Sequence, residues 1–205
     1  MEWLLLLTFV VAFLLFLYVA TVYYRENDGR ESAPRKTMIV LGSGGHTSEM
    51  IKLIRGLDPN LYNPIVFVHA DTDTKSMAHL RESNVGFKFS TRSIPRCREV
   101  GQSYVSSIAS TVKAFLSCIS LILQERPSLL LVNGPGTCIP VAYCVALFRV
   151  LNILSCRIVF VESFCRVQKL SVTGYLLYYV ADSFVVQWPQ LQRKYPRSVY
   201  LGILL

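Results

Sequence analysis

The segment that decides how this chain folds is Met38-Ile39-Val40-Leu41-Gly42-Ser43-Gly44-Gly45-His46-Thr47, because an apolar run gives way there, through glycines, to a helix-like pattern. A short apolar run of this kind is typical of a buried β-strand. Glycines after it let a phosphate approach backbone amides at the N-terminus of the next helix. His46 adds a hydrogen-bond donor or a proton acceptor in the same turn. The segment therefore predicts a strand, a turn and a helix that together hold a phosphorylated ligand.

The same alternation continues along the chain. Apolar, β-branched runs predict strands at residues 38–41, 65–69, 87–90, 129–133, 158–161 and 184–187. Segments of helical period predict helices at residues 47–57, 75–83, 103–124, 138–151 and 169–180. Strands that alternate with helices form an α/β fold with a largely parallel sheet, and right-handed crossovers bring the carboxyl ends of the strands to one edge.

The first part of the chain has a different character. From Trp3 to Tyr24 it runs for 22 residues without a charge or a proline, and a helix of about 33 Å is long enough to cross a hydrocarbon core of roughly 30 Å. A cleaved signal peptide is the alternative, but Glu2 stands where a basic start is usual and the apolar stretch is too long. We therefore predict a lumenal end at residues 1–2, a transmembrane helix at 3–24, a linker at 25–36 and one domain at 37–205. Basic residues follow the span, which places the domain in the cytosol.

The positive charge of the chain belongs to this domain. The first 36 residues carry equal numbers of acidic and basic side chains, so the formal net charge of +8 falls on residues 37–205. Such a domain favours anionic partners. Arg92, Arg96 and Arg98 form the tightest basic cluster, and no aromatic-rich motif for reading nucleic acid accompanies it. Acidic lipid headgroups or pyrophosphates fit better than nucleic acid, and a solvated loop with a few arginines is the alternative.

The six cysteines give no sign of a metal site or a disulfide framework. They show no Cys-x-x-Cys spacing, and four of them lie in apolar segments, as reduced core residues do. Neither His69 nor His79 supplies the short spacing of a zinc site, so we predict no metal.

Three predicted strand ends carry the candidate chemistry. They are residues 42–47, residues 133–137 (Asn133, Gly134, Pro135, Gly136 and Thr137) and residues 162–163. Thr47 and Thr137 are placed as helix caps, so two helix N-termini could face one anion. The alternative is that the glycines only tighten turns. A dinucleotide fingerprint lacks its third glycine, and a nucleotide-hydrolase loop lacks its Gly-Lys-Ser or Gly-Lys-Thr.

Glu162 ends an otherwise apolar strand. A buried carboxylate there would have a raised pKa and could act as a base. The alternative is that it accepts hydrogen bonds from neighbouring amides. Asp71 and Asp73 are interpreted first as residues of a loop and of a helix N-cap. The apolar helices near residues 104–123 and 139–154 are either core helices or surfaces that touch the membrane or another subunit.

Several ordered motifs together resemble a known family. They are Gly42-Ser43-Gly44-Gly45-His46-Thr47, Ala70-Asp71-Thr72-Asp73, Ile94-Pro95-Arg96, Arg98-Glu99-Val100, Asn133-Gly134-Pro135-Gly136-Thr137, Val161-Glu162-Ser163, Gln187-Trp188-Pro189 and Lys194-Tyr195-Pro196. The chain is similar, from about residue 38 to 202, to the membrane-anchoring subunits of the UDP-N-acetylglucosamine transferase of dolichol-linked oligosaccharide synthesis, the asparagine-linked glycosylation fourteen family.

The resemblance implies a Rossmann-like domain that is the N-terminal-type half of a GT-B glycosyltransferase. A soluble subunit of the asparagine-linked glycosylation thirteen type would bring the main UDP-sugar site. The implied reaction adds the second N-acetylglucosamine, with inversion, to N-acetylglucosaminyl-diphosphodolichol on the cytosolic face of the endoplasmic reticulum, in protein N-glycosylation. No cofactor and no metal are implied.

The resemblance also assigns residues. His46 is the first choice for the base or a phosphate contact, and Glu162 is the second. Gly44, Gly45 and residues 133–137 would hold the acceptor pyrophosphate or close on the donor, and Arg96 and Arg98 would guide the acceptor headgroup. The apolar tail would dock on the partner through Leu201, Gly202, Ile203, Leu204 and Leu205. A scaffold that only recruits a catalytic protein, or less readily an anchored NAD-dependent reductase, is the alternative function.

Overall fold

The computed structural model describes residues 34–97 and 107–204. The predicted transmembrane helix and most of the predicted linker lie outside these residues, as do Arg98 and Leu205. The division of the chain into anchor, linker and domain therefore stays a prediction.

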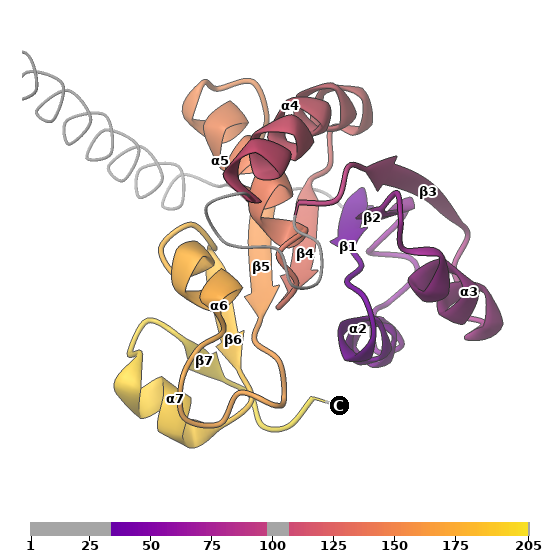
Figure 1. Ribbon diagram of the computed structural model, residues 1–205. Coiled ribbons are helices and arrows are strands. Elements are labelled where there is room, and N and C mark those ends of the chain that lie inside the picture. The colour runs from indigo at the N-terminus through magenta and orange to yellow at the C-terminus, as the bar shows by residue number, and fades with distance from the viewer. Residues whose placement is uncertain (1–33, 98–106, 205) are drawn as a thin grey trace, which may run out of the picture.

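Seven parallel strands form one sheet in the order β3-β2-β1-β4-β5-β6-β7 (Figure 1). The strands are β1 Thr37–Val40, β2 Ile65–Ala70, β3 Phe89–Ile94, β4 Leu129–Asn133, β5 Arg157–Val161, β6 Ser183–Val186 and β7 Val199–Tyr200. The helices between them are α2 Gly45–Ile54, α3 Thr74–Glu82, α4 Ser107–Glu125, α5 Cys138–Val150, α6 Val172–Leu177 and α7 Pro189–Lys194. The predicted α/β class with a Rossmann-like parallel sheet is confirmed.

The direction of the strand order reverses between β1 and β4. The chain runs from β1 outward through β2 to β3, and then returns past β1 to build the other side of the sheet from β4 to β7. In open α/β sheets the crevice at such a switch point, outside the carboxyl ends of the strands, is where ligands bind. The loops after β1 and β4 therefore meet at the place where a ligand site is expected.

Helices cover both faces of the sheet, and this explains why its strands are so apolar. In β1, Met38 and Val40 belong to the core under α4, α5, α6 and α7, whereas Ile39 packs with α2 and α3 on the other face. All three side chains are fully buried. Burying a side chain of this size stabilises the fold by about 1.5–3 kcal/mol. The apolar runs of the sequence thus correspond to strands covered on both sides.

The largest errors of the sequence prediction concern strands and helices at the margins. β3 begins two residues after the predicted start and runs four residues beyond the predicted end, because it pairs only with β2 and keeps polar residues such as Arg92 exposed. α6 covers only the middle of the predicted helix at residues 169–180. α7 and β7 are not among the predicted elements, because they are too short to give a periodic apolar pattern.

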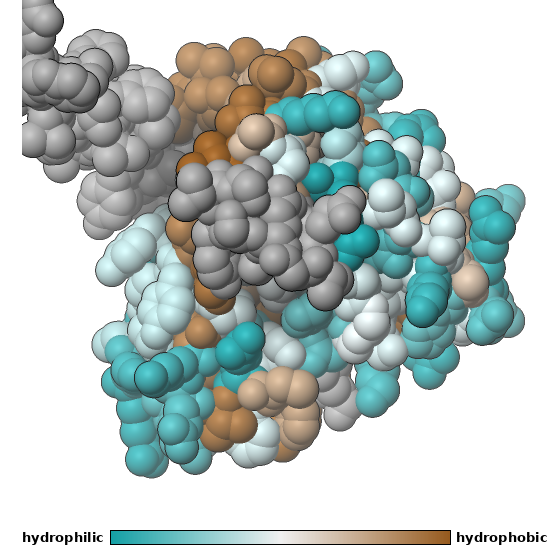
Figure 2. Space-filling view, viewed as in Figure 1, coloured by the Kyte–Doolittle hydropathy of each residue, from teal (hydrophilic) through white to brown (hydrophobic). Residues whose placement is uncertain are grey.

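One side of α4 is exposed although the helix is strongly apolar. Cys118 and Ile122 are fully buried against the core, whereas an apolar stripe of Ile108, Val112, Leu116 and Leu123 lies 43–62% exposed. Apolar side chains gather on the side of the molecule that α4 and α5 form (Figure 2). Within residues 34–97 and 107–204, one helix, Ile108–Glu125, is long and apolar enough to cross a membrane by length and composition. Its buried face shows that it also serves as a core helix.

Candidate functional site

The loops after β1 and β4 meet at His46. Asn133, the last residue of β4, donates a hydrogen bond from Nδ2 to the backbone oxygen of His46 at 2.9 Å. Gly134 follows with φ of 31°, and a Cβ at this position would collide with the His46 imidazole. Only glycine fits this position, because the ring packs directly against its backbone. Two segments that lie far apart in the sequence thus form one site.

Helix α2 begins at this meeting point. Its N-cap is Gly44, which has φ of 68° and makes no side-chain capping bond. The helix therefore starts at Gly45, two residues earlier than predicted. The prediction of Thr47 as a cap is wrong. Its side chain is 1% exposed and donates to the backbone oxygen of Gly42, with Ser76 Oγ as a second neighbour at 2.7 Å. Thr47 therefore holds the turn in shape, and the backbone of Gly44 and Gly45 forms the open end of the helix.

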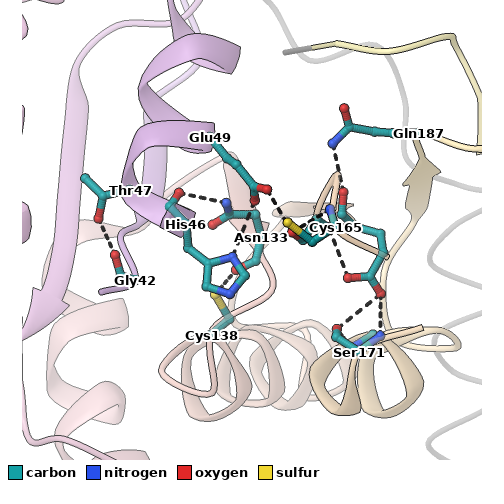
Figure 3. A network of polar contacts seen from close by, with 12 residues as sticks. Gly42, His46, Thr47, Glu49, Asn133, Cys138, Cys165, Ser171 and Gln187 are labelled. Carbon is teal, nitrogen blue, oxygen red and sulfur yellow. Dashed lines mark hydrogen bonds and ion pairs between the residues drawn. The ribbon is translucent and has the colours of Figure 1, made fainter. Parts of the chain in front are cut away.

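His46 faces a carboxylate on its own helix. Its Nδ1 lies 3.4 Å from Oε2 of Glu49, one helical turn further along (Figure 3). This is the distance of an ion pair, but the contact does not meet the geometry of a hydrogen bond. The imidazole is 33% exposed and the Glu49 side chain 15% exposed. Part of the ring therefore reaches solvent while its Nδ1 is buried.

Glu49 is held from a second direction by the loop after β5. Ser163 Oγ donates to Glu49 Oε1 at 2.8 Å. Burial acts to raise the pKa of this carboxyl, but the nearby charge of His46 and the hydrogen bonds from the Ser163 hydroxyl and the Phe164 amide outweigh burial and lower the pKa. Glu49 is therefore ionised beside the imidazole at neutral pH.

Three buried polar atoms at this point have no hydrogen-bond partner among the described residues. They are His46 Nδ1, Glu49 Oε2 and Asn133 Oδ1. A buried unpaired polar atom costs about 1–3 kcal/mol, so such atoms are uncommon and concentrate at functional sites. We call these three residues the histidine cluster.

Glu162 has the opposite environment. It is 0% exposed, and its two oxygens accept from Ser163 N at 3.0 Å, Ser171 N at 2.8 Å and Ser171 Oγ at 3.1 Å. Its backbone oxygen accepts from Gln187 Nε2 at 3.0 Å. Burial raises the pKa of this carboxyl, although these hydrogen bonds oppose the shift. The geometry favours the structural alternative, in which Glu162 accepts bonds from nearby amides. We call Glu162, Ser171 and Gln187 the glutamate cluster.

The loop after β4 leads into α5. Thr137 stands at the N-cap as predicted, but it has helical φ and ψ and makes no side-chain capping bond. Cys138 Sγ contacts the backbone oxygen of Asn133 at 3.3 Å, which holds the loop against the helix. A Cβ at Gly136 would meet nothing within 4 Å, so this side of the loop is open. The N-terminal ends of α2 and α5 therefore flank the histidine cluster.

The predicted basic cluster is divided in the structure. Arg92 pairs with Glu125 at 2.7 Å, and Lys36 reaches the same carboxylate at 2.7 Å. Arg96 donates to Thr72 Oγ1 at 3.3 Å at the carboxyl edge of the sheet. Asp73 caps α3 by accepting from Ser76 N at 3.1 Å, as predicted. Of the two described arginines of this cluster, Arg96 is therefore the one at the carboxyl edge of the sheet.

The tail after β7 lies against the glutamate cluster. Leu204 N donates to Gln187 Oε1 at 3.2 Å, and its side chain packs on the core under α2 and α3. Leu201 is 63% exposed and Ile203 55% exposed, while Gly202 has φ of 90°. The tail thus presents alternate apolar side chains to solvent.

The described cysteines are free, and all but Cys165 are buried. Burial raises the pKa of the Cys97 thiol to about 11, which keeps it protonated and a poor metal ligand. The described residues contain no group of three or more His, Cys, Asp or Glu that could hold a metal ion.

Sequence reasoning missed Glu49 and the role of Ser163. Glu49 stands three residues after His46 in a predicted helix, a spacing that brings side chains together and could have identified it. No local signal pairs Ser163 with Glu49, because they lie 114 residues apart.

Comparison with solved structures shows that most of this chain shares its fold with part of a known protein. The crystal structure of MurG from Acinetobacter baumannii, a GT-B protein, matches with a TM-score of 0.59 and 16% sequence identity over 77% of this chain. The chain spans 43% of the MurG chain. The fold is therefore that of one half of a GT-B glycosyltransferase.

Sequence comparison identifies the family. The chain is 40% identical over 191 residues to the UDP-N-acetylglucosamine transferase subunit ALG14 of Homo sapiens, with 88% of each chain covered. It is 43% identical over 169 residues to the subunit of the same name from Candida albicans, covering 82% of this chain and 77% of that one. The family described as oligosaccharide biosynthesis protein Alg14 like matches residues 37–204. The chain therefore belongs to the Alg14 family.

Proposed function

We propose that this chain is the membrane-anchoring, acceptor-side subunit of a two-chain UDP-N-acetylglucosamine transferase. The reaction would add the second N-acetylglucosamine to N-acetylglucosaminyl-diphosphodolichol in protein N-glycosylation. The names of its relatives support the donor and the subunit character. The observation that carries the proposal is the meeting of two glycine-containing loops at His46, at the switch point of the sheet.

The need for a partner chain is inferred from the size of the fold. MurG is more than twice as long as the part that this chain matches. A soluble subunit of the asparagine-linked glycosylation thirteen type would supply the other half and the main UDP-sugar site. The active cleft would then lie between the two chains, and this chain alone would be inactive.

In the proposed site His46 acts as the base. Its partly exposed imidazole can accept the proton of the acceptor hydroxyl as that oxygen attacks the sugar with inversion. The backbone at Gly44 and Gly45 and the loop of Asn133, Gly134, Gly136 and Thr137 would contact the acceptor diphosphate, because two helix N-termini favour an anion there. Arg96, and Arg98 outside the described residues, would guide the acceptor headgroup.

The membrane side of the proposal rests on apolar surfaces. The predicted helix at residues 3–24 would be a single membrane span that anchors the chain in the endoplasmic reticulum, with the domain in the cytosol. The exposed apolar stripe of α4 supports a position close to lipid. The exposed tail residues Leu201 and Ile203, with Gly202, Leu204 and Leu205, would dock on the soluble subunit.

The decisive experiment compares catalysis with assembly. The full chain is co-purified with the soluble subunit, and transfer from UDP-N-acetylglucosamine to a diphosphate-linked acceptor is measured. We expect His46→Ala to reduce kcat by about 10²–10⁴-fold, the usual contribution of general acid–base catalysis, while the complex still assembles.

His79→Ala is the matched control, because His79 is exposed on α3 and outside the proposed site. It should transfer sugar at the normal rate. If His46→Ala also keeps the normal rate in an assembled complex, the chain is a scaffold and the assignment of the base is wrong.

A further inference from the structure

His46 and Glu49 form a close pair in the first turns of α2. They lie one turn apart on α2, and 3.4 Å separates His46 Nδ1 from Glu49 Oε2. Nδ1 is buried, whereas a third of the imidazole surface is exposed. The ring therefore has one nitrogen turned toward the carboxylate and the protein, and its exposed part is available to a ligand.

The position of Glu49 is fixed independently of His46. Ser163 Oγ, from the loop after β5, holds Oε1 at 2.8 Å, and the Phe164 amide also favours the ionised carboxylate. On the other side, the backbone oxygen of His46 is held by Asn133, and Gly134 packs against the ring. Both members of the pair are thus restrained by residues at the carboxyl ends of β4 and β5, which pair in one sheet.

We propose that Glu49 is a positioning residue that keeps the proton of neutral His46 on Nδ1, so that Nε2 is free to accept the proton of the acceptor hydroxyl. This inference rests on the proposed function. A carboxylate 3.4 Å from Nδ1 repels a lone pair on that nitrogen and attracts a proton there, so the fixed Glu49 favours the Nδ1–H tautomer. As His46 becomes cationic, the same carboxylate stabilises the charge.

In the proposed transfer, each bond that forms is matched by one that breaks. The hydroxyl proton of the acceptor moves to Nε2, and the electron pair of that O–H bond becomes the new bond to the anomeric carbon. The bond from that carbon to the UDP oxygen breaks, and its electron pair leaves with UDP. Imidazolium later returns the proton to water. Glu49 remains ionised throughout and touches neither substrate.

Among the described residues, Glu49 is the charged group that pairs with the imidazole. The Glu162 carboxylate, at the end of β5, is directed to Ser163 N and Ser171. Asn133, at the end of β4, is neutral, and within the described residues His46 forms its ion pair with Glu49. The carboxylate of Glu49 is therefore the group that sets the state of the ring.

Glu49→Gln tests the idea, since glutamine keeps the size of the side chain and can still accept from Ser163. In the complex of the full chain with the soluble subunit, we expect kcat to fall by about 10²-fold, with KM for donor and acceptor within about twofold. Glu82→Gln is the matched control, because Glu82 is exposed at the end of α3. It should leave kcat unchanged. An unchanged kcat in Glu49→Gln overturns the inference.

A nitrogen spectrum separates positioning from a merely structural role. The chain has three histidines, so ¹⁵N-histidine labelling in a complex with the unlabelled subunit gives few signals, and His46→Gln assigns one of them. We expect the Nδ1–H tautomer for His46 in the wild type and a mixture of tautomers in Glu49→Gln. A fall in kcat without any change of tautomer also overturns the inference.

The two measurements keep the two proposals apart. If the wild-type complex transfers no N-acetylglucosamine, the proposed function fails, while the tautomer measurement still decides whether Glu49 orients the ring. If the wild type transfers sugar and His46→Ala does not, the proposed function stands, and the result for Glu49→Gln decides the inference.

Discussion

Two carboxylates at the carboxyl edge of the sheet, Glu49 and Glu162, differ in nearly every physical property. Glu162 is fully buried, and hydrogen bonds from the protein occupy both of its oxygens. Glu49 is 15% exposed, one oxygen is held by Ser163, and the other faces His46 without a hydrogen bond. Their pKa values shift in opposite directions, since burial prevails for Glu162 and hydrogen bonds prevail for Glu49.

This contrast separates a carboxylate whose hydrogen bonds are all made within the protein from one that still has an unpaired oxygen. A buried group whose hydrogen bonds are all made by the protein stabilises the fold and has none left for a ligand. A pair with unsatisfied atoms costs stability and is retained where a site needs it. Ser163 joins the two regions, because its backbone binds Glu162 and its hydroxyl binds Glu49.

The largest expected effect tests this distinction between Glu162 and Glu49 directly. Glu162→Ala leaves three donors of Ser163 and Ser171 without their acceptor, so we expect the free energy of unfolding to fall by about 3 kcal/mol. Glu49→Ala should lower it by about 1 kcal/mol only, because one bond is lost at a partly exposed site. Chemical denaturation of the full chain in detergent measures both. Equal losses of unfolding free energy in the two variants would contradict this distinction between the two carboxylates.

A smaller effect is expected from Gly174, in the first turn of α6. A Cβ at Gly174 would collide with the Glu162 carboxylate and lie 3.1 Å from Ser171 Oγ. We expect Gly174→Ala to destabilise the chain by about 2 kcal/mol, because the bonded cluster cannot give way without losing hydrogen bonds. Gly136→Ala is the control for stability, since its Cβ would meet nothing within 4 Å, and it should change the unfolding free energy by less than about 0.5 kcal/mol. A stable Gly174→Ala variant would show that the glutamate cluster is loosely packed.

The smallest effect is the pH dependence of stability, whose sign should differ between the two carboxylates. The pKa of Glu162 is raised above its ordinary value of 4.5, so its contribution is greatest below pH 4.5 and declines as the pH rises through the raised folded value. The pKa of Glu49 is lowered from 4.5, so its contribution is present above pH 4.5 and is lost as the pH falls through the lowered folded value.

We therefore expect Glu162→Gln to gain stability relative to the wild type as the pH rises from 4.5. The deficit of Glu49→Gln should disappear at acid pH. Denaturation curves across this range check both slopes, and parallel curves for the two variants would contradict the assignment.

Much of the fold could be predicted because its signals are local. The apolar runs of β1, β4 and β5 and the glycines that follow β1 and β4 identified the strands and the loops that form the site. The predicted bounds of the edge strand β3 were wrong, because most of its side chains are exposed or half-buried and such a strand needs no apolar run. The cap assigned to Thr47 was wrong, because the helix begins earlier and its side chain is bonded to Gly42 and Ser76 instead.

The candidate site was predicted less completely than the fold. His46, Asn133 and Gly134 were identified from loop motifs, and the structure brings them together. Glu162 was identified as a buried carboxylate, but only its hydrogen bonds show that the structural alternative fits it better. Glu49 was not identified, because a single acidic residue in a helix is usually a solvated one.

The α/β alternation, the two loops at the switch point and the family could be read from the sequence, since each depends on residues that lie close together along the chain. The tertiary structure decided which carboxylate accompanies His46. Asn133 and His46 are 87 residues apart, and Ser163 and Glu49 are 114 apart, so their contacts exist only after β1, β4 and β5 pair in one sheet. Burial and hydrogen bonding of a side chain depend on such distant contacts, and these two properties separate the histidine cluster from the glutamate cluster.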